Sequence, residues 1–139
     1  MNIYFAASIR GGRKDAKIYS EIVDYLKSYG TVLTEHVGDI TLSEMGDDGP
    51  TDKYIHDRDL AWLDESDVLV SEVTNVSLGV GYEIRDAERL EMPVLCLYRP
   101  QVGKALSAMI TGSDQNINKD YHTLDEAKKH IDDFFRNIK

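Results

Sequence analysis

Short apolar runs alternate with helical patterns along this chain of 139 residues, and this alternation restricts its fold more than any other feature. Runs that we interpret as strands cover residues 3–7, 31–37, 67–73 and 93–98, with a weaker candidate near Tyr121. Apolar residues at helical spacing cover residues 15–29, 51–66, 82–91, 104–110 and the stretch from 124 onward. Such alternation predicts a parallel sheet covered by helices on both faces.

The predicted fold is therefore α/β, a flavodoxin/Rossmann-like three-layer sandwich around a central, mostly parallel five-stranded sheet. A length of 139 residues corresponds to one domain, and no linker or internal repeat divides residues 1–139. In such sheets ligands bind outside the carboxyl ends of the strands, where the strand order switches. That rule singles out the loops at residues 7–13, 37–51 and 74–81.

The net charge of −9, from 16 Lys+Arg against 25 Asp+Glu, argues against a nucleic-acid polymer as partner, because such binding needs a basic face. A small anionic ligand is compatible with this charge, since a few clustered cations suffice. Cys96 lies in an apolar run and is interpreted as a core residue rather than a nucleophile. One cysteine excludes an internal disulfide, and no apolar stretch predicts a membrane span or signal peptide. We therefore expect a cytoplasmic protein without a membrane partner.

The segment Ser8-Ile9-Arg10-Gly11-Gly12-Arg13 follows the first predicted strand and indicates a phosphate-binding loop. Its paired glycines let the backbone approach a ligand closely, and the following helix presents unpaired N–H groups. The hydroxyl of Ser8 and the guanidinium groups of Arg10 and Arg13 suit phosphate oxygens. The spacing does not match a P-loop. A tight turn with solvated arginines is the alternative.

The segment Ser77-Leu78-Gly79-Val80-Gly81-Tyr82-Glu83 follows the third predicted strand. Its glycine spacing is only a fragment of a dinucleotide fingerprint, because Ile84 occupies the third glycine position. Glu83 stands near the start of a helix, where a carboxylate either stabilises the helix dipole or faces the ligand. Beside a phosphate loop it could act as a nucleophile toward a sugar carbon.

Asp59 lies four residues after Ile55 on the helix predicted at 51–66, so it shares the inward face while Asp57 turns toward solvent. An acid close to another carboxylate can acquire a raised pKa and donate a proton. A salt-bridged or capping helix acid is the alternative. We expect no metal and no cofactor, because metal-ligand spacing is missing from the histidines, which are His36, His56, His122 and His130.

Taken together, these segments resemble the 2′-deoxynucleoside 5′-monophosphate N-glycosidase (Rcl-like) family of the nucleoside 2-deoxyribosyltransferase superfamily. The resemblance covers roughly residues 3–112 in collinear order. Besides the two long motifs above, it rests on Ile3-Tyr4-Phe5, Leu33-Thr34-Glu35-His36-Val37, Ile55-His56, Asp59-Leu60, Trp62-Leu63, Glu72-Val73-Thr74, Leu95-Cys96-Leu97, Arg99-Pro100-Gln101 and Leu106-Ser107-Ala108-Met109-Ile110.

The resemblance implies hydrolysis of the N-glycosidic bond of a deoxynucleoside monophosphate, with a covalent deoxyribosyl intermediate on Glu83. It implies proton handling by Asp59, and it places Tyr4 beside the sugar and the nucleophile. It further implies substrate-binding roles for Ala7, Ser8, Ile9, Arg10, Gly11, Gly12, Arg13, Ile22, Ser77, Gly79, Ser107, Ala108 and Met109.

The resemblance also implies a homodimer in which Ser107 reaches the site of the neighbouring subunit. The chain departs from the family at Arg85-Asp86-Ala87, where the family usually has Gly-Arg-Ala, and this departure leaves the preferred base open. Three other functions stay open: a nucleoside 2-deoxyribosyltransferase, a ribonucleotide (CMP-type) N-glycosidase and a nucleotide-binding protein without turnover.

Overall fold

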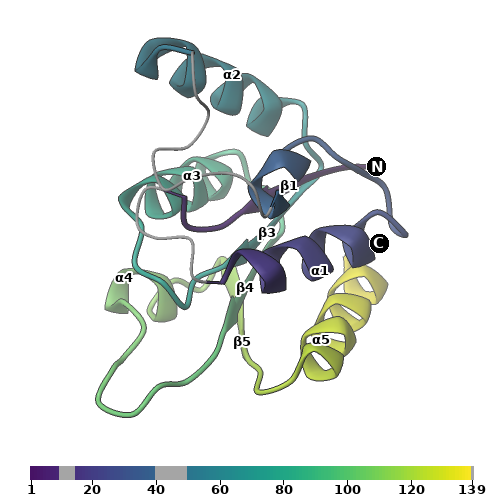
Figure 1. Ribbon diagram of the computed structural model, residues 1–139, viewed down its shortest axis with the longest axis vertical. Coiled ribbons are helices and arrows are strands. Elements are labelled where there is room, and N and C mark those ends of the chain that lie inside the picture. The colour runs from purple at the N-terminus through teal and green to yellow at the C-terminus, as the bar shows by residue number, and fades with distance from the viewer. Residues whose placement is uncertain (10–14, 40–49, 139) are drawn as a thin grey trace.

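The computed structural model describes residues 1–9, 15–39 and 50–138, and its centre is a five-stranded sheet (Figure 1). The strands stand in the order β2-β1-β3-β4-β5, and all four neighbouring pairs are parallel. This is the flavodoxin-like strand order, with its switch point between β1 and β3. The predicted α/β fold is confirmed. The strands are β1 (Asn2–Ala6), β2 (Thr31–Val32), β3 (Val68–Glu72), β4 (Val94–Tyr98) and β5 (Asn116–Asp120).

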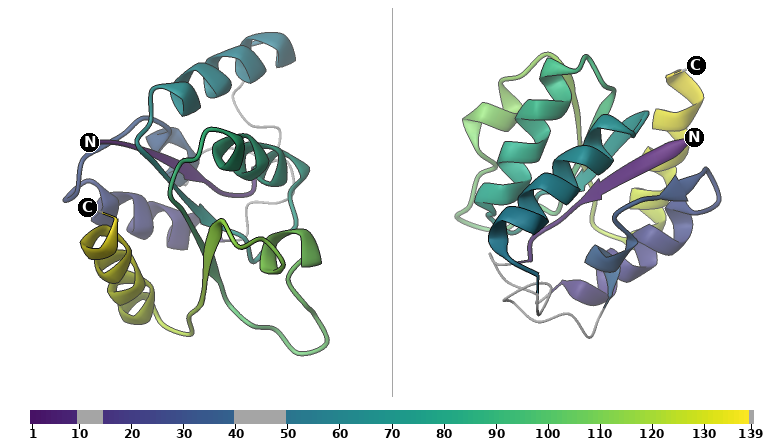
Figure 2. Two further views of the ribbon diagram at one scale, coloured as in Figure 1. Left: turned by 180° about the vertical axis from the view of Figure 1, so that it is seen from behind. Right: turned by 90° about the horizontal axis from the view of Figure 1, so that it is seen from above.

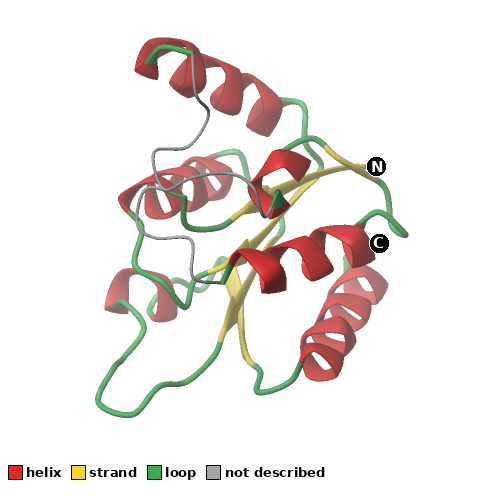
Figure 3. Cartoon of the chain, viewed as in Figure 1, coloured by secondary structure: helices red, strands yellow, loops and turns green. Residues whose placement is uncertain are grey.

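Helices cover both faces of the sheet and complete the three layers (Figures 1 and 2). One face carries α1 (Ala16–Leu26) and α5 (Leu124–Asn137). The other carries α2 (Asp52–Asp64), α3 (Leu78–Arg89) and the short α4 (Ala108–Thr111). A 3-10 turn, η1 (Glu35–Gly38), packs against α1. The strands run in one direction, so their carboxyl ends share one edge of the sheet (Figure 3).

Strand side chains alternate between two separate cores, and this alternation decides which residues can meet. In β1, Ile3 and Phe5 pack toward α1 and α5, whereas Tyr4 packs toward α2 and α3. Leu97 of β4 joins the first core, whereas Cys96 joins the second and is fully buried, as predicted. The two faces of the sheet therefore carry different side chains, beginning with β1.

Four predicted element boundaries are corrected by the structure. The predicted strand at 31–37 is reduced to β2, which is followed by η1. Helix α1 ends at Leu26 rather than near residue 29, and α4 covers 108–111 rather than 104–110. Helix α3 begins four residues before the predicted start, because the Ser77 side chain accepts a hydrogen bond from the Val80 N–H and caps the helix. Most of the predicted loop at 38–50 lies outside the described residues.

The early end of β2 has a local physical cause in Thr34. This buried hydroxyl accepts a hydrogen bond from the Phe5 N–H at 2.8 Å and donates one to the Phe5 carbonyl at 2.7 Å. One side chain thus satisfies the backbone groups that a longer β2 would have paired. The chain is then free to turn into η1 beside α1.

We expect Thr34→Val to lower the free energy of unfolding by about 1–3 kcal/mol, because it leaves both backbone groups of Phe5 buried without a partner. Thr31→Val, on the exposed residue of β2, is the matched control and should change stability little. Urea denaturation of the three proteins measures the difference. Equal stability of the two variants would contradict this account of β2.

Candidate active site

The candidate site lies at the switch point between β1 and β3, on the side of the sheet that α2 and α3 cover. Tyr4 reaches it from β1, with 2% of its surface exposed. Asp59 comes from α2 and Glu83 from the second turn of α3. The charges of Glu83 and Asp59 both act on the Tyr4 hydroxyl, and Tyr4 hydrogen-bonds Glu83. The structure thus brings together the three residues that the sequence predicts to be catalytic.

Glu83 is the titratable group whose environment most clearly suggests a reactive carboxyl. Burial removes the water that would stabilise its charge, and the neighbouring Asp59 adds repulsion, so the pKa of Glu83 is raised to about 8. The hydrogen bond from Tyr4 opposes this rise without cancelling it. The pKa of Tyr4 lies far above its ordinary value, first because of burial and then because of the two carboxylates. Tyr4 is therefore a permanently neutral hydrogen-bond donor.

Arg58 holds Asp59 in place, a role that the sequence analysis did not identify. Its Nε donates to Asp59 Oδ1 at 2.9 Å, and both side chains are 18% exposed. The guanidinium lies 4.6 Å from the centre of the Trp62 ring, which adds a cation–π contact. As predicted, Asp59 faces inward while Asp57 is about half exposed and pairs with Lys53. Two sequence features could have indicated this role of Arg58: it directly precedes Asp59, and it lies four residues before Trp62, on the same side of the helix.

The residues predicted to bind phosphate follow the same edge of the sheet. Ala7 and Ser8 are buried directly after β1, and Ile9 is partly buried. Ser77 caps α3, and a Cβ added to Gly79 would meet only the Ser77 hydroxyl at 3.9 Å. The predicted residues Arg10, Gly11, Gly12 and Arg13 lie outside the described residues. Ile22 is not part of this group, because it is fully buried in the core beneath α1.

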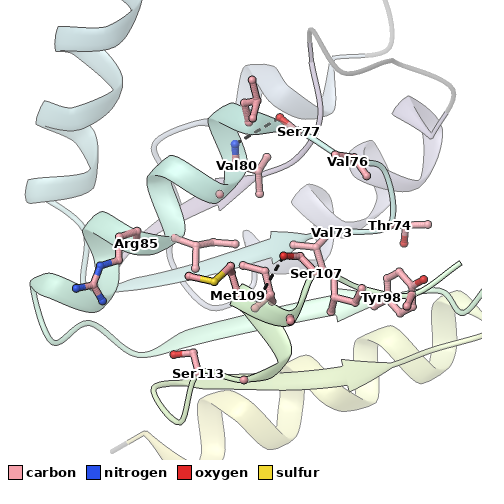
Figure 4. A pocket seen from close by; sticks show the side chains of 18 of the residues that line it. Val73, Thr74, Val76, Ser77, Val80, Arg85, Tyr98, Ser107, Met109 and Ser113 are labelled. Atoms are coloured by element: carbon pink, nitrogen blue, oxygen red, sulfur yellow. Dashed lines mark hydrogen bonds between the residues drawn. The ribbon is translucent and has the colours of Figure 1, made fainter.

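The last three predicted binding residues, Ser107, Ala108 and Met109, lie at the start of α4 and line a different space. This is a cavity of about 1140 Å³ between α3, α4 and the loops beside them. Figure 4 shows Ser77 and Val80 on one wall, and Ser107 and Met109 on another. None of the three candidate catalytic residues is among the described residues that line this cavity. Within one chain, Ser107 thus belongs to the opposite side of α3 from Glu83.

The two charged residues that depart from the resembled family make pairs along the surface of α3. Arg85 donates to Glu88 at 3.1 Å, and Arg89 donates to Asp86 at 3.1 Å. Arg85 lines the α3/α4 cavity and its side chain is 70% exposed. At Arg85 the departure therefore modifies the cavity side of α3, whereas Asp86 is not among the residues that line the cavity.

The other titratable groups of the described residues lie in ordinary surface or core environments. No group of three His, Cys, Asp or Glu side chains there could hold a metal ion. His56 is exposed and contacts Asp57 and the Tyr82 hydroxyl. Burial raises the pKa of the Cys96 thiol to about 11, which makes it a poor nucleophile. No described helix is long and apolar enough to cross a membrane.

A family model described as nucleoside 2-deoxyribosyltransferase matches residues 3–128. The chain belongs to this family. Within the family, it is 50% identical over 146 aligned residues to a 5-hydroxymethyl-dUMP N-hydrolase of Tetraodon nigroviridis, with all of both chains covered. It is 56% identical over 132 residues to the protein of that name from Mus musculus, covering 94% of this chain and 75% of the mouse protein.

Solved structures of other proteins share the fold at low sequence identity. A CMP N-glycosidase from Clostridium botulinum superposes with a TM-score of 0.66 at 14% identity, covering 95% of this chain and 99% of the other. At that identity the likeness shows the fold, and it leaves the substrate to be argued from the residues.

We expect Glu83→Gln to stabilise the fold by on the order of a few kcal/mol at high pH. The folded-state pKa of Glu83 is raised above the value of a free glutamate, so its protonated form favours folding, and that contribution is lost as the pH rises through about 8. The stability difference from the native protein should therefore be small near pH 4, grow between pH 4.5 and 8, and level off above. Thermal unfolding across this range measures it.

Glu65→Gln is the matched control, because Glu65 is exposed at the end of α2 and loses little water on folding. Its stability difference should stay flat with pH. A flat profile for Glu83→Gln as well would show that Glu83 is not desolvated in the folded protein.

Proposed function

We propose that this protein hydrolyses the N-glycosidic bond of 2′-deoxynucleoside 5′-monophosphates and releases the free base and 2-deoxyribose 5-phosphate. The observation that carries the proposal is the assembly of Tyr4, Asp59 and Glu83 in one desolvated site. The chain that builds it is 50–56% identical to the N-hydrolases named above. Glycosidic cleavage needs a carboxylate beside the anomeric carbon and a second group that handles the proton.

Glu83 acts as the nucleophile in this mechanism. Its ionised carboxylate attacks C1′, the C1′–N bond breaks, and the bonding electron pair leaves with the base, which takes up a proton. The ester on Glu83 is then attacked by water at C1′, which frees the carboxylate and releases a proton. Desolvation makes the carboxylate more reactive, and the developing positive charge on the sugar is stabilised beside it. Because the pKa of Glu83 is about 8, the ionised form grows as the pH rises through that value.

Asp59 acts on the base and Tyr4 acts on the sugar side of the scissile bond. Asp59, held by Arg58, handles the proton or orients the departing base. Tyr4 donates its hydrogen bond to Glu83 and directs that carboxylate toward the sugar. A ring packed this close to the nucleophile also leaves little room for a 2′-hydroxyl. This crowding favours deoxyribonucleotides over ribonucleotides.

The 5′-phosphate binds at the edge where β1 and β3 end. Ser8, Ser77 and Gly79 supply the described part of this site, and the predicted residues 10–13 complete it. Phosphate binding anchors the substrate with its sugar beside Glu83, and it stabilises the bound substrate and the transition state alike. The same loop separates this function from a transferase acting on nucleosides, whose uncharged 5′-hydroxyl needs no arginines. Among the bases, 5-hydroxymethyluracil is the one we expect, because the relatives named above carry it in their names.

The active form that we propose is a homodimer, formed where the α3/α4 cavity meets a second copy of the chain. Three side chains around that cavity are apolar and almost fully exposed, namely Val76 at 90%, Leu78 at 93% and Met109 at 83%. Nothing lies within 4 Å of a Cβ added to Gly81, which lines the same cavity, so α3 offers a close approach there. Ser107 would then reach the partner's site. The buried free thiol of Cys96 fits a reducing location such as the cytoplasm.

We expect Glu83→Ala to abolish base release from 5-hydroxymethyl-dUMP while the protein still binds the nucleotide, because the phosphate contacts remain. Chromatography of free base measures turnover across matched deoxy- and ribonucleoside monophosphates and nucleosides. Release confined to deoxy monophosphates supports the proposal. Near-normal turnover by the variant would exclude Glu83 as the nucleophile, and release that requires an added acceptor base would identify a transferase.

Mixing two impaired variants tests the homodimer. Glu83→Ala and Ser107→Ala should each lower turnover, and their mixture should recover activity, because a mixed dimer holds one site with both residues intact. Leu78→Glu should give a monomer in sedimentation and lose activity, whereas Val102→Glu, fully exposed away from the cavity, should do neither. A mixture no more active than its Ser107→Ala component would show that Ser107 does not act across subunits.

A further inference from the structure

A buried polar network occupies the α1/α5 side of the sheet edge, and the mechanism above does not use it. Glu72, the last residue of β3, is fully buried. Its carboxylate accepts hydrogen bonds from the Thr74 N–H at 2.6 Å, from the Thr74 hydroxyl at 2.9 Å and from the Tyr121 hydroxyl. The Nε of Arg99 lies 3.9 Å from the same carboxylate. Burial raises the pKa of Glu72, and the hydrogen bonds from Tyr121 and Thr74 oppose that rise, so this carboxyl group depends on partners that are fixed around it.

The network continues from Glu72 to the start of α1. The side chain of Arg99 pairs with Asp15, the residue that precedes α1. The backbone N–H of Arg99 donates a hydrogen bond to the Thr74 hydroxyl at 3.0 Å. Asn75 donates to Asp15 at 2.9 Å and to the Tyr19 hydroxyl at 3.1 Å. Residues from the ends of β3 and β4, from the loop after β5 and from α1 are thus joined through one set of polar contacts.

These contacts end beside the residues that we assign to phosphate binding. Asn75 lies two residues before Ser77, which caps α3, and Asp15 directly precedes α1, the helix that follows β1 and Ser8 in the chain. The network therefore connects the opening of α1 to the opening of α3. Side-chain alternation places it on the opposite face from Tyr4, so Glu72 and Arg99 do not touch the candidate catalytic residues.

We propose that the network of Glu72, Arg99, Asp15, Thr74, Asn75 and Tyr121 is a positioning device that sets the affinity for the substrate's 5′-phosphate. It fixes the starts of α1 and α3 relative to each other at the edge where we place the phosphate, and it leaves the candidate catalytic carboxylates unaffected. The inference rests on the proposed function for its substrate. Loosening the network should raise KM and leave kcat unchanged, because it weakens phosphate binding equally in the bound substrate and in the transition state.

Two isosteric substitutions loosen the network from opposite ends. Asp15→Asn removes the charge that pairs with Arg99, and Tyr121→Phe removes one donor to Glu72. Asp24→Asn and Tyr25→Phe are the matched controls. Asp24 is an exposed acid of α1 paired with Lys27, and the Tyr25 hydroxyl binds Asp132 away from the site. The readouts are kcat and KM for 5-hydroxymethyl-dUMP, the Kd of 2-deoxyribose 5-phosphate by calorimetry, and thermal stability.

Each network variant should raise KM and the Kd of 2-deoxyribose 5-phosphate roughly three- to tenfold, the size of one lost hydrogen bond, with kcat within about twofold. The double variant should raise them by less than the product of the single effects, because both act through one network. The two controls should leave both constants unchanged. A drop in kcat with constant KM, or effects that multiply in the double variant, would overturn the inference.

The calorimetric arm separates this inference from the proposed function, because it needs no turnover. If the native protein releases base while the network variants bind 2-deoxyribose 5-phosphate as tightly as it does, the function stands and the inference fails. If the native protein releases no base from any monophosphate, yet binds 2-deoxyribose 5-phosphate more tightly than the variants do, the inference stands and the function fails.

Discussion

The parallel pairing of β1 with β3 is the constraint on which the rest of this structure depends. Because Tyr4 lies opposite Leu69 in that ladder, its ring must face the layer formed by α2 and α3. The same pairing leaves the carboxyl ends of both strands at one edge, where the two loops with the distinctive chemistry begin. The order of the strands, with β1 inserted between β2 and β3, makes this edge the switch point where doubly wound sheets bind ligands.

Function and stability oppose one another at this edge. Glu83 is desolvated and lies beside Asp59, so ionising it weakens the fold, yet the ionised form is the one that the proposed mechanism uses as its nucleophile. Arg58 limits the repulsion by engaging Asp59 while resting on Trp62. The two apolar cores offset the stability that is lost when Glu83 ionises. The hydrogen bond that Tyr4 donates to Glu83 partly offsets the rise in the pKa of this carboxyl group.

The two faces of the sheet carry different groups of polar side chains. The α2/α3 face carries the candidate catalytic side chains, and the α1/α5 face carries the network around Glu72 that joins the loop ends. Period-two alternation allows this division, because neighbouring residues of one strand project to opposite faces. If both proposals hold, substitutions on one face should affect the chemical step and substitutions on the other face should affect phosphate binding.

The sequence by itself determined the fold class, the order of most elements and the candidate catalytic residues. Strand–helix alternation predicts a parallel sheet, and helical spacing placed Asp59 inward with Asp57 outward. It failed where tertiary contacts outweigh local pattern. The Thr34 hydroxyl ended β2 early by bonding to Phe5. Only the tertiary structure decided the partners of Arg58 and Glu72 and the pKa of Glu83. Those properties depend on desolvation and on charges brought together from segments far apart in the chain.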